Sequence, residues 1–299
     1  MNAHQQNVED FRLKLLFEQK LAVKMRKIFT DMSQEAKAYY KSKGAILNID
    51  HYDNEIKATL QAHYREVAKK FKKRLRLHIE KSRFTFDVKA VEDDIDTYIA
   101  MYIRKRANDQ TGFIAATNKK ELDLAFSKTL ISSLITGKFM SQQDIADEGA
   151  LNFENRAMGR ASTIGLTETQ NIAEATKDIE AFQLFNTDIV AGGVTLKREI
   201  MTKTWSAILD VRTREAHMEA DDQTVMQDDP FIVMGEELMF PGDDSRGASL
   251  ENIINCRCNT TRAIELAELP EWVFHPENRA PYKSYSFNKL IGACSHHRF

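Results

Sequence analysis

The sequence uses cysteine sparingly. Its three cysteines (Cys256, Cys258 and Cys294) cannot supply a disulfide framework in a chain of 299 residues, and two cysteines one residue apart rarely reach relaxed disulfide geometry. We therefore expect reduced thiols. The sequence also lacks any run of about 18 apolar residues and the charged-then-apolar start of a signal peptide, so we expect a soluble protein made in the cytosol, with no membrane partner.

Proline is absent from the first 229 residues, and all five prolines lie between residues 230 and 281. A proline inside a helix costs about 3 kcal/mol, so a long proline-free stretch rich in Lys, Glu, Ala and Leu is typical of long helices. We expect the α+β fold class, with a long, mostly helical N-terminal region at residues 1–160. After this region we expect a small α+β domain at residues 161–270 and an extended tail at 271–299.

Apolar spacing and capping residues divide the helical region. Apolar residues three and four apart predict helices over residues 8–42, 53–81 and 88–108, and the first of these includes Leu15 and Leu16 on its apolar side. Asn118 and Ser141 each precede an acidic residue by three positions, the spacing of a capping box. They predict further helix starts at residues 119 and 142, and the segment 168–185 is also predicted to be helical.

The charge is unevenly placed along the chain. Residues 1–110 carry 23 Lys and Arg against 16 Asp and Glu, a balance of +7, which leaves −9 for the remainder. A basic run lies within the first part (Lys69, Lys70, Lys72, Lys73, Arg74 and Arg76). This run is either a solvated helix face or a surface that contacts DNA phosphates or an acidic partner through counterion release.

Five short motifs follow one another in the last third of the chain. They are K-T-W at 203–205, D-V-R-T-R-E-A-H at 210–217, D-D-P-F at 228–231, P-G-D at 241–243 and N-C-R-C at 255–258. This order resembles the C-terminal domain of the phage Mu F-like minor capsid, or head morphogenesis, family. The residues that carry the resemblance are Thr167, Glu168, Trp205, Asp210, Arg212, Arg214, Pro241, Gly242, Asp243, Asn255 and Arg257. The sequence departs from the family at Asp222, where the pattern has a glycine.

The resemblance implies a structural role in a virus particle. Proteins of this family are linked to the portal vertex, are packaged in few copies, and are implicated in head assembly and DNA delivery. It therefore implies the portal protein and other capsid proteins as partners, with contact to packaged double-stranded DNA. It also implies an oligomeric arrangement in the phage head, the host cytoplasm as the site of assembly, and no turnover chemistry.

His217, Cys256 and Cys258 are residue types that bind zinc. A fourth ligand could come from Asp221, Asp210 or Glu168. The alternative is that the two cysteines pack on the inner face of a strand, while Asn255 and Arg257 alternate with them and face outward. The sequence leaves both interpretations open.

Asp210, Arg212, Arg214, Asp243 and Arg257 form a second group of candidate residues. A bidentate network of arginine and carboxylate groups that fixes the fold is one interpretation. A nuclease or transferase site in which His217 joins these residues is another, although no nucleophile or phosphate loop accompanies them. A nucleic-acid-binding helical protein is a third alternative, and it requires the basic run to be open to solvent.

Overall fold

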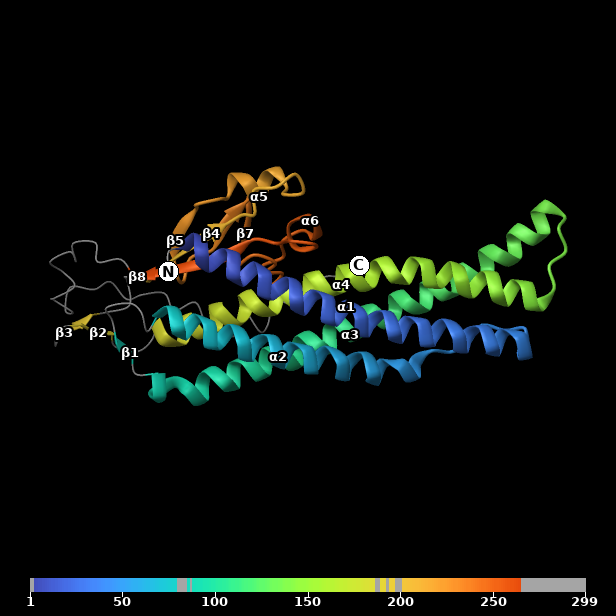
Figure 1. The fold of residues 1–299 in the computed structure, drawn as a ribbon, viewed down its shortest axis with the longest axis horizontal. Helices are drawn as coiled ribbons and strands as arrows, with labels where there is room; N and C mark the ends of the chain where they lie inside the picture. Colours follow the sequence, from blue (N-terminus) through green and yellow to red (C-terminus); the bar gives the residue numbers. More distant parts are fainter. Residues whose placement is uncertain are drawn as a thin grey trace. The chain divides into compact units, whose positions relative to one another are not determined.

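The computed structural model describes residues 3–79, 85–86, 88–185, 189–191, 194–196 and 201–264 (Figure 1). It confirms a helical N-terminal region that is followed by a small α+β part. The helices of the first part are α1 (Ala3–Lys43), the short 3₁₀ helix η1 (Asp50–Tyr52), α2 (Asp53–Ile79), α3 (Val88–Thr136) and α4 (Gln142–Phe185). None of the described helices is long and apolar enough to cross a membrane. The tail expected at 271–299 and Cys294 lie outside the described residues.

Helix α3 does not end near residue 108 or restart at 119, so the predicted capping box at Asn118 is wrong. Asn118 is buried inside an unbroken helix, where its amide donates to the sulfur of Met32 and accepts from Arg160. These tertiary partners occupy the side chain that a capping box would need. The box at Ser141 is confirmed, because the Ser141 hydroxyl accepts from the Asp144 amide and the Asp144 carboxylate accepts from the Ser141 amide.

The chain forms two compact units, and neither is continuous in sequence. One unit comprises residues 16–65 and 103–166, and the other comprises 1–15, 66–102 and 167–299. The first unit is a bundle of helical segments whose core includes Leu21, Met25, Phe29, Ile56, Phe126 and Phe153. Helices α1 and α4 approach closely within it at Gly165, where an added Cβ would lie 2.6 Å from the Glu18 carbonyl oxygen. Only glycine fits this contact.

The second unit contains the α+β module. Strand β4 (Met201–Ser206) lies between β5 (Thr224–Met226) and β8 (Asn259–Ile264), and it is antiparallel to both. Along β4 buried and half-buried residues alternate. The hairpin of β6 (Phe231–Val233) and β7 (Glu236–Leu238), together with α5 (Glu215–Glu219) and α6 (Leu250–Ile253), completes the module. A separate small sheet has the order β1 (Thr85–Phe86), β2 (Ile189–Ala191) and β3 (Val194–Leu196).

A small apolar core holds the module together. Trp205 lies at its centre, and its ring makes edge contacts with Phe231 at 5.4 Å and with His217 at 5.6 Å between centroids. Both cysteines of the N-C-R-C motif belong to this core. The buried core also includes Ala220, Val233, Leu238, Ala248 and Ile253. The apolar core of the module therefore contacts His217 and includes both cysteines of the N-C-R-C motif.

Candidate metal centre

Cys256 and Cys258 lie in the segment that joins α6 to β8. Asn255 precedes them with φ of 57°, a left-handed conformation that asparagine adopts more readily than most residues. Its backbone N–H donates to the hydroxyl of Thr167 at 3.2 Å. This turn sends the chain back into the core, so that both cysteines are buried while Arg257 between them stays partly exposed.

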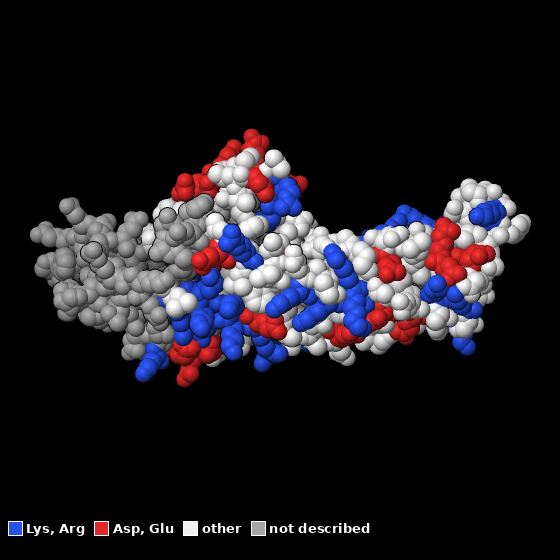
Figure 2. Space-filling view, in the orientation of Figure 1, with Lys and Arg blue, Asp and Glu red and all other residues white. Residues whose placement is uncertain are grey.

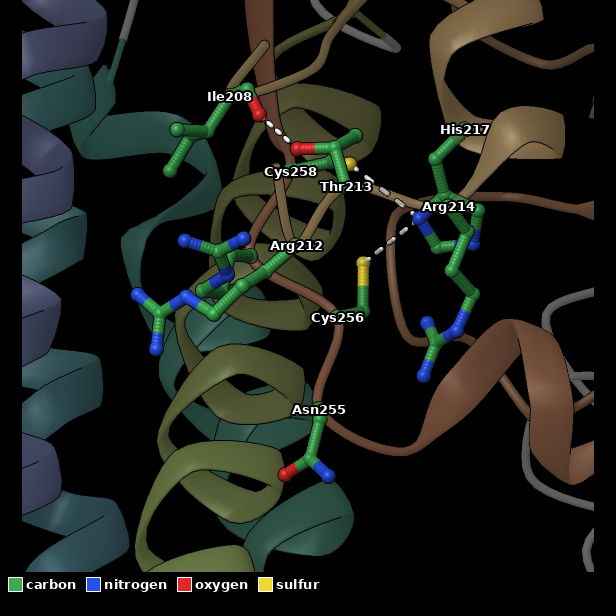
Figure 3. A pocket seen from close by; sticks show the side chains of 9 residues that line it. Ile208, Arg212, Thr213, Arg214, His217, Asn255, Cys256 and Cys258 are labelled. Carbon is green, nitrogen blue, oxygen red and sulfur yellow. Dashed lines mark hydrogen bonds between the residues drawn. The ribbon is translucent and has the colours of Figure 1, made fainter. Parts of the chain in front are cut away.

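His217 reaches the two thiols from α5. Its Nδ1 atom lies 3.4 Å from Sγ of Cys258 and 3.7 Å from Sγ of Cys256 (Figure 3). The three side chains are buried, and their ligand atoms all lie within 4.8 Å of one another. The cluster that the sequence proposed therefore exists in space, and it could hold a metal ion.

The two thiols differ in acidity. Burial disfavours a thiolate at Cys256, but hydrogen bonds from Cys258 and His217 outweigh burial and lower the pKa of Cys256 well below its ordinary value. The pKa of Cys258 is raised, because its proton is shared with Cys256 and because burial opposes a second charge. A thiol whose pKa is lowered beside a histidine is a favourable start for binding a cation, because metals bind the deprotonated sulfur.

The carboxylates considered as a fourth ligand are used elsewhere. Asp210 accepts two hydrogen bonds from Arg257, at 2.6 and 2.7 Å, and Asp221 accepts one from the Ala207 amide at 2.7 Å. Glu168 is buried within α4. Among the residues that the structure describes, the group around the histidine consists of His217, Cys256 and Cys258 without a carboxylate.

The arginines and aspartates do not form one network. Arg257 and Asp210 make a bidentate pair, and Arg257 holds the pKa of Asp210 well below its usual range. Arg214 instead donates to the Ile254 carbonyl, and Arg212 is exposed. Asp243 lies apart from all three arginines, because it closes its own turn by accepting from the amides of Met239 and Ser245 at 2.9 Å each. The prediction that Asp243 joins the ion-pair network with the arginines is therefore wrong.

The Pro-Gly-Asp turn has a different role. Gly242 takes φ of 88°, and its carbonyl accepts from the side-chain amide of Asn171 at 2.8 Å. The Pro241 carbonyl accepts from Gln170 in the same way, at 3.3 Å. The motif thus fastens the module to α4. Asp222 takes φ of 61°, so it adopts the backbone conformation that the family's glycine would favour.

The basic run on α2 is divided between ion pairs and solvent. Lys72 pairs with Glu92 and Asp96, Arg74 with Glu9 and Asp10, and Arg76 with Glu92 and Glu180. Lys69, Lys70 and Lys73 are exposed. Figure 2 likewise shows acidic groups interspersed among the basic ones. Contact with DNA stays a prediction for the three exposed lysines, whereas the other three residues already neutralise acidic groups of the chain.

A buried ionic cluster was missed by the sequence analysis. The Lys14 ammonium is 1% exposed and donates to Gln170 at 2.8 Å, Glu174 at 2.6 Å and Asn259 at 2.5 Å. Lys177 contacts Glu174 at 2.6 Å and Asp10 at 3.3 Å. The two lysines together outweigh burial and lower the pKa of Glu174 to about 2. A signal existed, because Lys14 falls between Asp10 and Phe17 on the spacing of the buried face of α1.

His217, Cys256 and Cys258 line a pocket that three arginines also line. It contains about 220 Å³ of empty space, part of it open to solvent, and it is lined by Ile208, Arg212, Thr213, Arg214, His217, Asn255, Cys256, Arg257 and Cys258. Figure 3 shows Arg212 and Arg214 on opposite sides of Cys256. No family model, curated protein or solved structure matches the chain.

Proposed function

We propose that the protein is a minor capsid protein that acts in phage head morphogenesis at the portal vertex. The observation that carries this proposal is that motifs in the order of the Mu F-like family belong to one folded module. Trp205 forms its core, Asp210 and Arg257 pair, Asn255 meets Thr167, and the Pro-Gly-Asp turn binds α4. Residues that resemble the family in sequence therefore also cooperate in structure.

These contacts favour a structural role for the motif over the alternative of a nuclease or transferase. His217 is 2% exposed and directs Nδ1 at two sulfur atoms, and Arg214 donates to a main-chain carbonyl. A general base needs to reach the proton that it abstracts in a bound substrate. The Nδ1 atom of His217 is instead occupied by two thiols of the protein itself.

A surface for an assembly partner lies at the junction of α3 and α4. Leu130, Ile131, Leu134 and Ile135 are 41–79% exposed, and their spacing places them on one side of α3. Phe139, in the connection to α4, is 98% exposed. Exposed apolar clusters of this kind mark protein contacts. We assign this surface, the α3–α4 tip, to the portal protein.

Co-expression with the portal and major capsid proteins tests the assignment. The unaltered protein is expected to co-purify with the portal, and replacing Leu134, Ile135 and Phe139 by serine is expected to abolish that association. A matched control replaces Leu209 and Val211, which are also exposed apolar residues, and should leave it intact. If the tip variant still binds the portal and enters heads normally, the docking surface is wrong. If the unaltered protein neither binds the portal nor enters heads, the proposed function is wrong.

We further assign zinc to the three-ligand cluster. A tetrahedral zinc with bonds of about 2.3 Å to sulfur and about 2.0 Å to nitrogen separates these ligand types by about 3.5 Å. The two distances from Nδ1, 3.4 and 3.7 Å, bracket that value. Zinc would join α5 to the segment before β8, and His217 and both cysteines would hold it without any catalytic step.

Elemental analysis of protein purified without chelators tests the zinc assignment. About one equivalent per chain is expected, and the double variant Cys256→Ser, Cys258→Ser should lose both the metal and about 2–5 kcal/mol of stability, because hydroxyl groups replace buried ligands. Cys294→Ser is measured beside it, because this cysteine lies outside the described residues and its variant shows whether a third thiol also holds the metal. Zinc far below one equivalent in the unaltered protein would contradict the metal assignment and leave the packing of buried thiols as the explanation.

A further inference from the structure

The pocket beside the cysteines is lined by three arginines together with the three residues of the cluster. Arg212, Arg214 and Arg257 line it together with His217, Cys256 and Cys258. The described residues that line it include no aspartate or glutamate. The arginines of this lining attract anions.

The charges do not cancel within the pocket. Arg257 is neutralised by its bidentate pair with Asp210. Arg214 donates one hydrogen bond to the Ile254 carbonyl, which leaves its charge uncompensated and other N–H groups free to donate. The Arg212 side chain is exposed, and the contact that the structure describes for this residue is made by its backbone N–H to Asp210. Figure 3 shows the two side chains extending away from each other, so both guanidinium groups would turn toward the pocket to serve one bound anion.

The proposed metal also lacks a ligand. Structural zinc sites take four ligands, whereas the described part of the chain brings three to this cluster. A pocket that is lined by all three ligands gives an external group access to the remaining position. The ligand that fills this position must also be compatible with the two arginines.

We propose that this pocket binds an oxyanion of the phosphate class, held between Arg212 and Arg214, which supplies the fourth ligand to the metal. This inference rests on the zinc assignment above. A guanidinium presents paired N–H donors that match the oxygens of phosphate. Inorganic phosphate or a terminal phosphate group has at least three free oxygens, enough for both guanidinium groups and the metal. A carboxylate has two oxygens, and so does a phosphate inside a nucleic-acid strand.

The test uses the full-length protein loaded with Co²⁺, whose visible absorption reports its ligands. Inorganic phosphate is expected to change the cobalt absorption bands in a saturable manner. Arg212→Gln and Arg214→Gln should each weaken phosphate binding about tenfold or more, because each removes charge-assisted hydrogen bonds. Arg246→Gln is the matched control, because Arg246 pairs with Glu237 and does not line the pocket.

Each outcome decides the inference. If Co²⁺ binds and millimolar phosphate leaves the bands unchanged, the anion site is wrong and the zinc assignment survives. If the protein binds neither Co²⁺ nor Zn²⁺, both are wrong. If Cys294→Ser alters the bands and phosphate does not, the chain supplies its own fourth ligand. Because Arg214→Gln could unfold the module, the thermal unfolding of this variant is also measured. Arg212 is exposed, so Arg212→Gln tests phosphate binding without a change in the fold.

The source of the phosphate is then distinguished with short DNA duplexes. A duplex with a 5′-terminal phosphate is expected to compete with inorganic phosphate, and the same duplex without it is expected to compete poorly. Equal competition by both duplexes would overturn the preference for a terminal phosphate. If competition by the phosphorylated duplex disappears in Arg212→Gln, the DNA end is bound at this pocket. If it persists there unchanged, the assignment of the phosphate to this pocket is wrong.

Discussion

Replacing Lys14 by methionine should destabilise the second compact unit strongly. Methionine keeps the length of the side chain but removes the ammonium that binds Gln170, Glu174 and Asn259. Removing one member of a buried ion pair typically costs 3–5 kcal/mol, because the partner charge stays buried. At roughly 2–4 °C per kcal/mol, this corresponds to a decrease in the melting temperature of about 6–20 °C. Lys24→Met, at an exposed position of the same helix, is the control and should change little.

A double-mutant cycle separates the ion pair from general packing. In Lys14→Met the Glu174 carboxylate stays buried without the Lys14 ammonium. Adding Glu174→Gln removes that charge, so the double variant should be more stable than the sum of the two single effects predicts. Lys177 keeps its contact with Asp10 in that variant. Strict additivity, measured by urea unfolding, would refute the reasoning, since it would mean that Lys14 and Glu174 do not stabilise each other.

The pH dependence gives an independent measurement of the same pair. The pKa of Glu174 is lowered from 4.5 to about 2 in the folded protein, so its ionised form stabilises the fold above pH 4.5, and this stabilisation is lost as the pH falls from 4.5 through 2. The shift corresponds to roughly 3 kcal/mol. In Lys14→Met the folded pKa should rise toward 4.5, and the acid-induced loss of stability should become smaller. An unchanged acid limb would contradict this explanation.

Three further predictions concern other elements. Burial raises the pKa of Glu180 from 4.5 to about 7, so the folded state holds a proton that the unfolded state releases. The free energy of unfolding should therefore fall by roughly 3 kcal/mol as the pH rises from 4.5 through 7. Glu180→Gln should remove this pH dependence in urea titrations. Asp222→Gly should raise the stability or leave it unchanged, because glycine adopts φ of 61° without the cost of roughly 1 kcal/mol that other residues bear; a clear loss of stability would contradict this. Changing Lys69, Lys70 and Lys73 to glutamate should abolish salt-sensitive retention on DNA while the melting temperature stays nearly constant; equal retention of the variant would exclude this surface.

Local sequence patterns correctly predicted the structural features that depend on residues close together in the chain. The N-terminal region expected at residues 1–160 is mostly helical, and Ser141 caps α4 as its spacing predicts. The proximity of His217 to the cysteines, about 40 positions away, was one of two interpretations that the residue types left open. The capping box at Asn118 failed because Arg160, far along the chain, binds its side chain.

The face of α1 shows most clearly where local spacing is insufficient. Leu15 and Leu16 were placed on the apolar side but are 42% and 58% exposed, while Lys14 beside them is buried. Helical spacing indicates which residues share a face, and it does not identify a polar partner such as Glu174, 160 residues away. The ionic cluster could not be derived without those partners.

The discontinuous second unit has a consequence for the order of folding during synthesis. All residues of the bundle unit lie between 16 and 166, so they leave the ribosome before most of the other unit exists. The start of α1 must then wait, because Lys14 has no contact with Asn259 until 245 further residues have been made. Closing so long a loop is slow. Cleavage by a protease added to stalled ribosomes should therefore be expected between residues 1 and 15 until strand β8 has emerged.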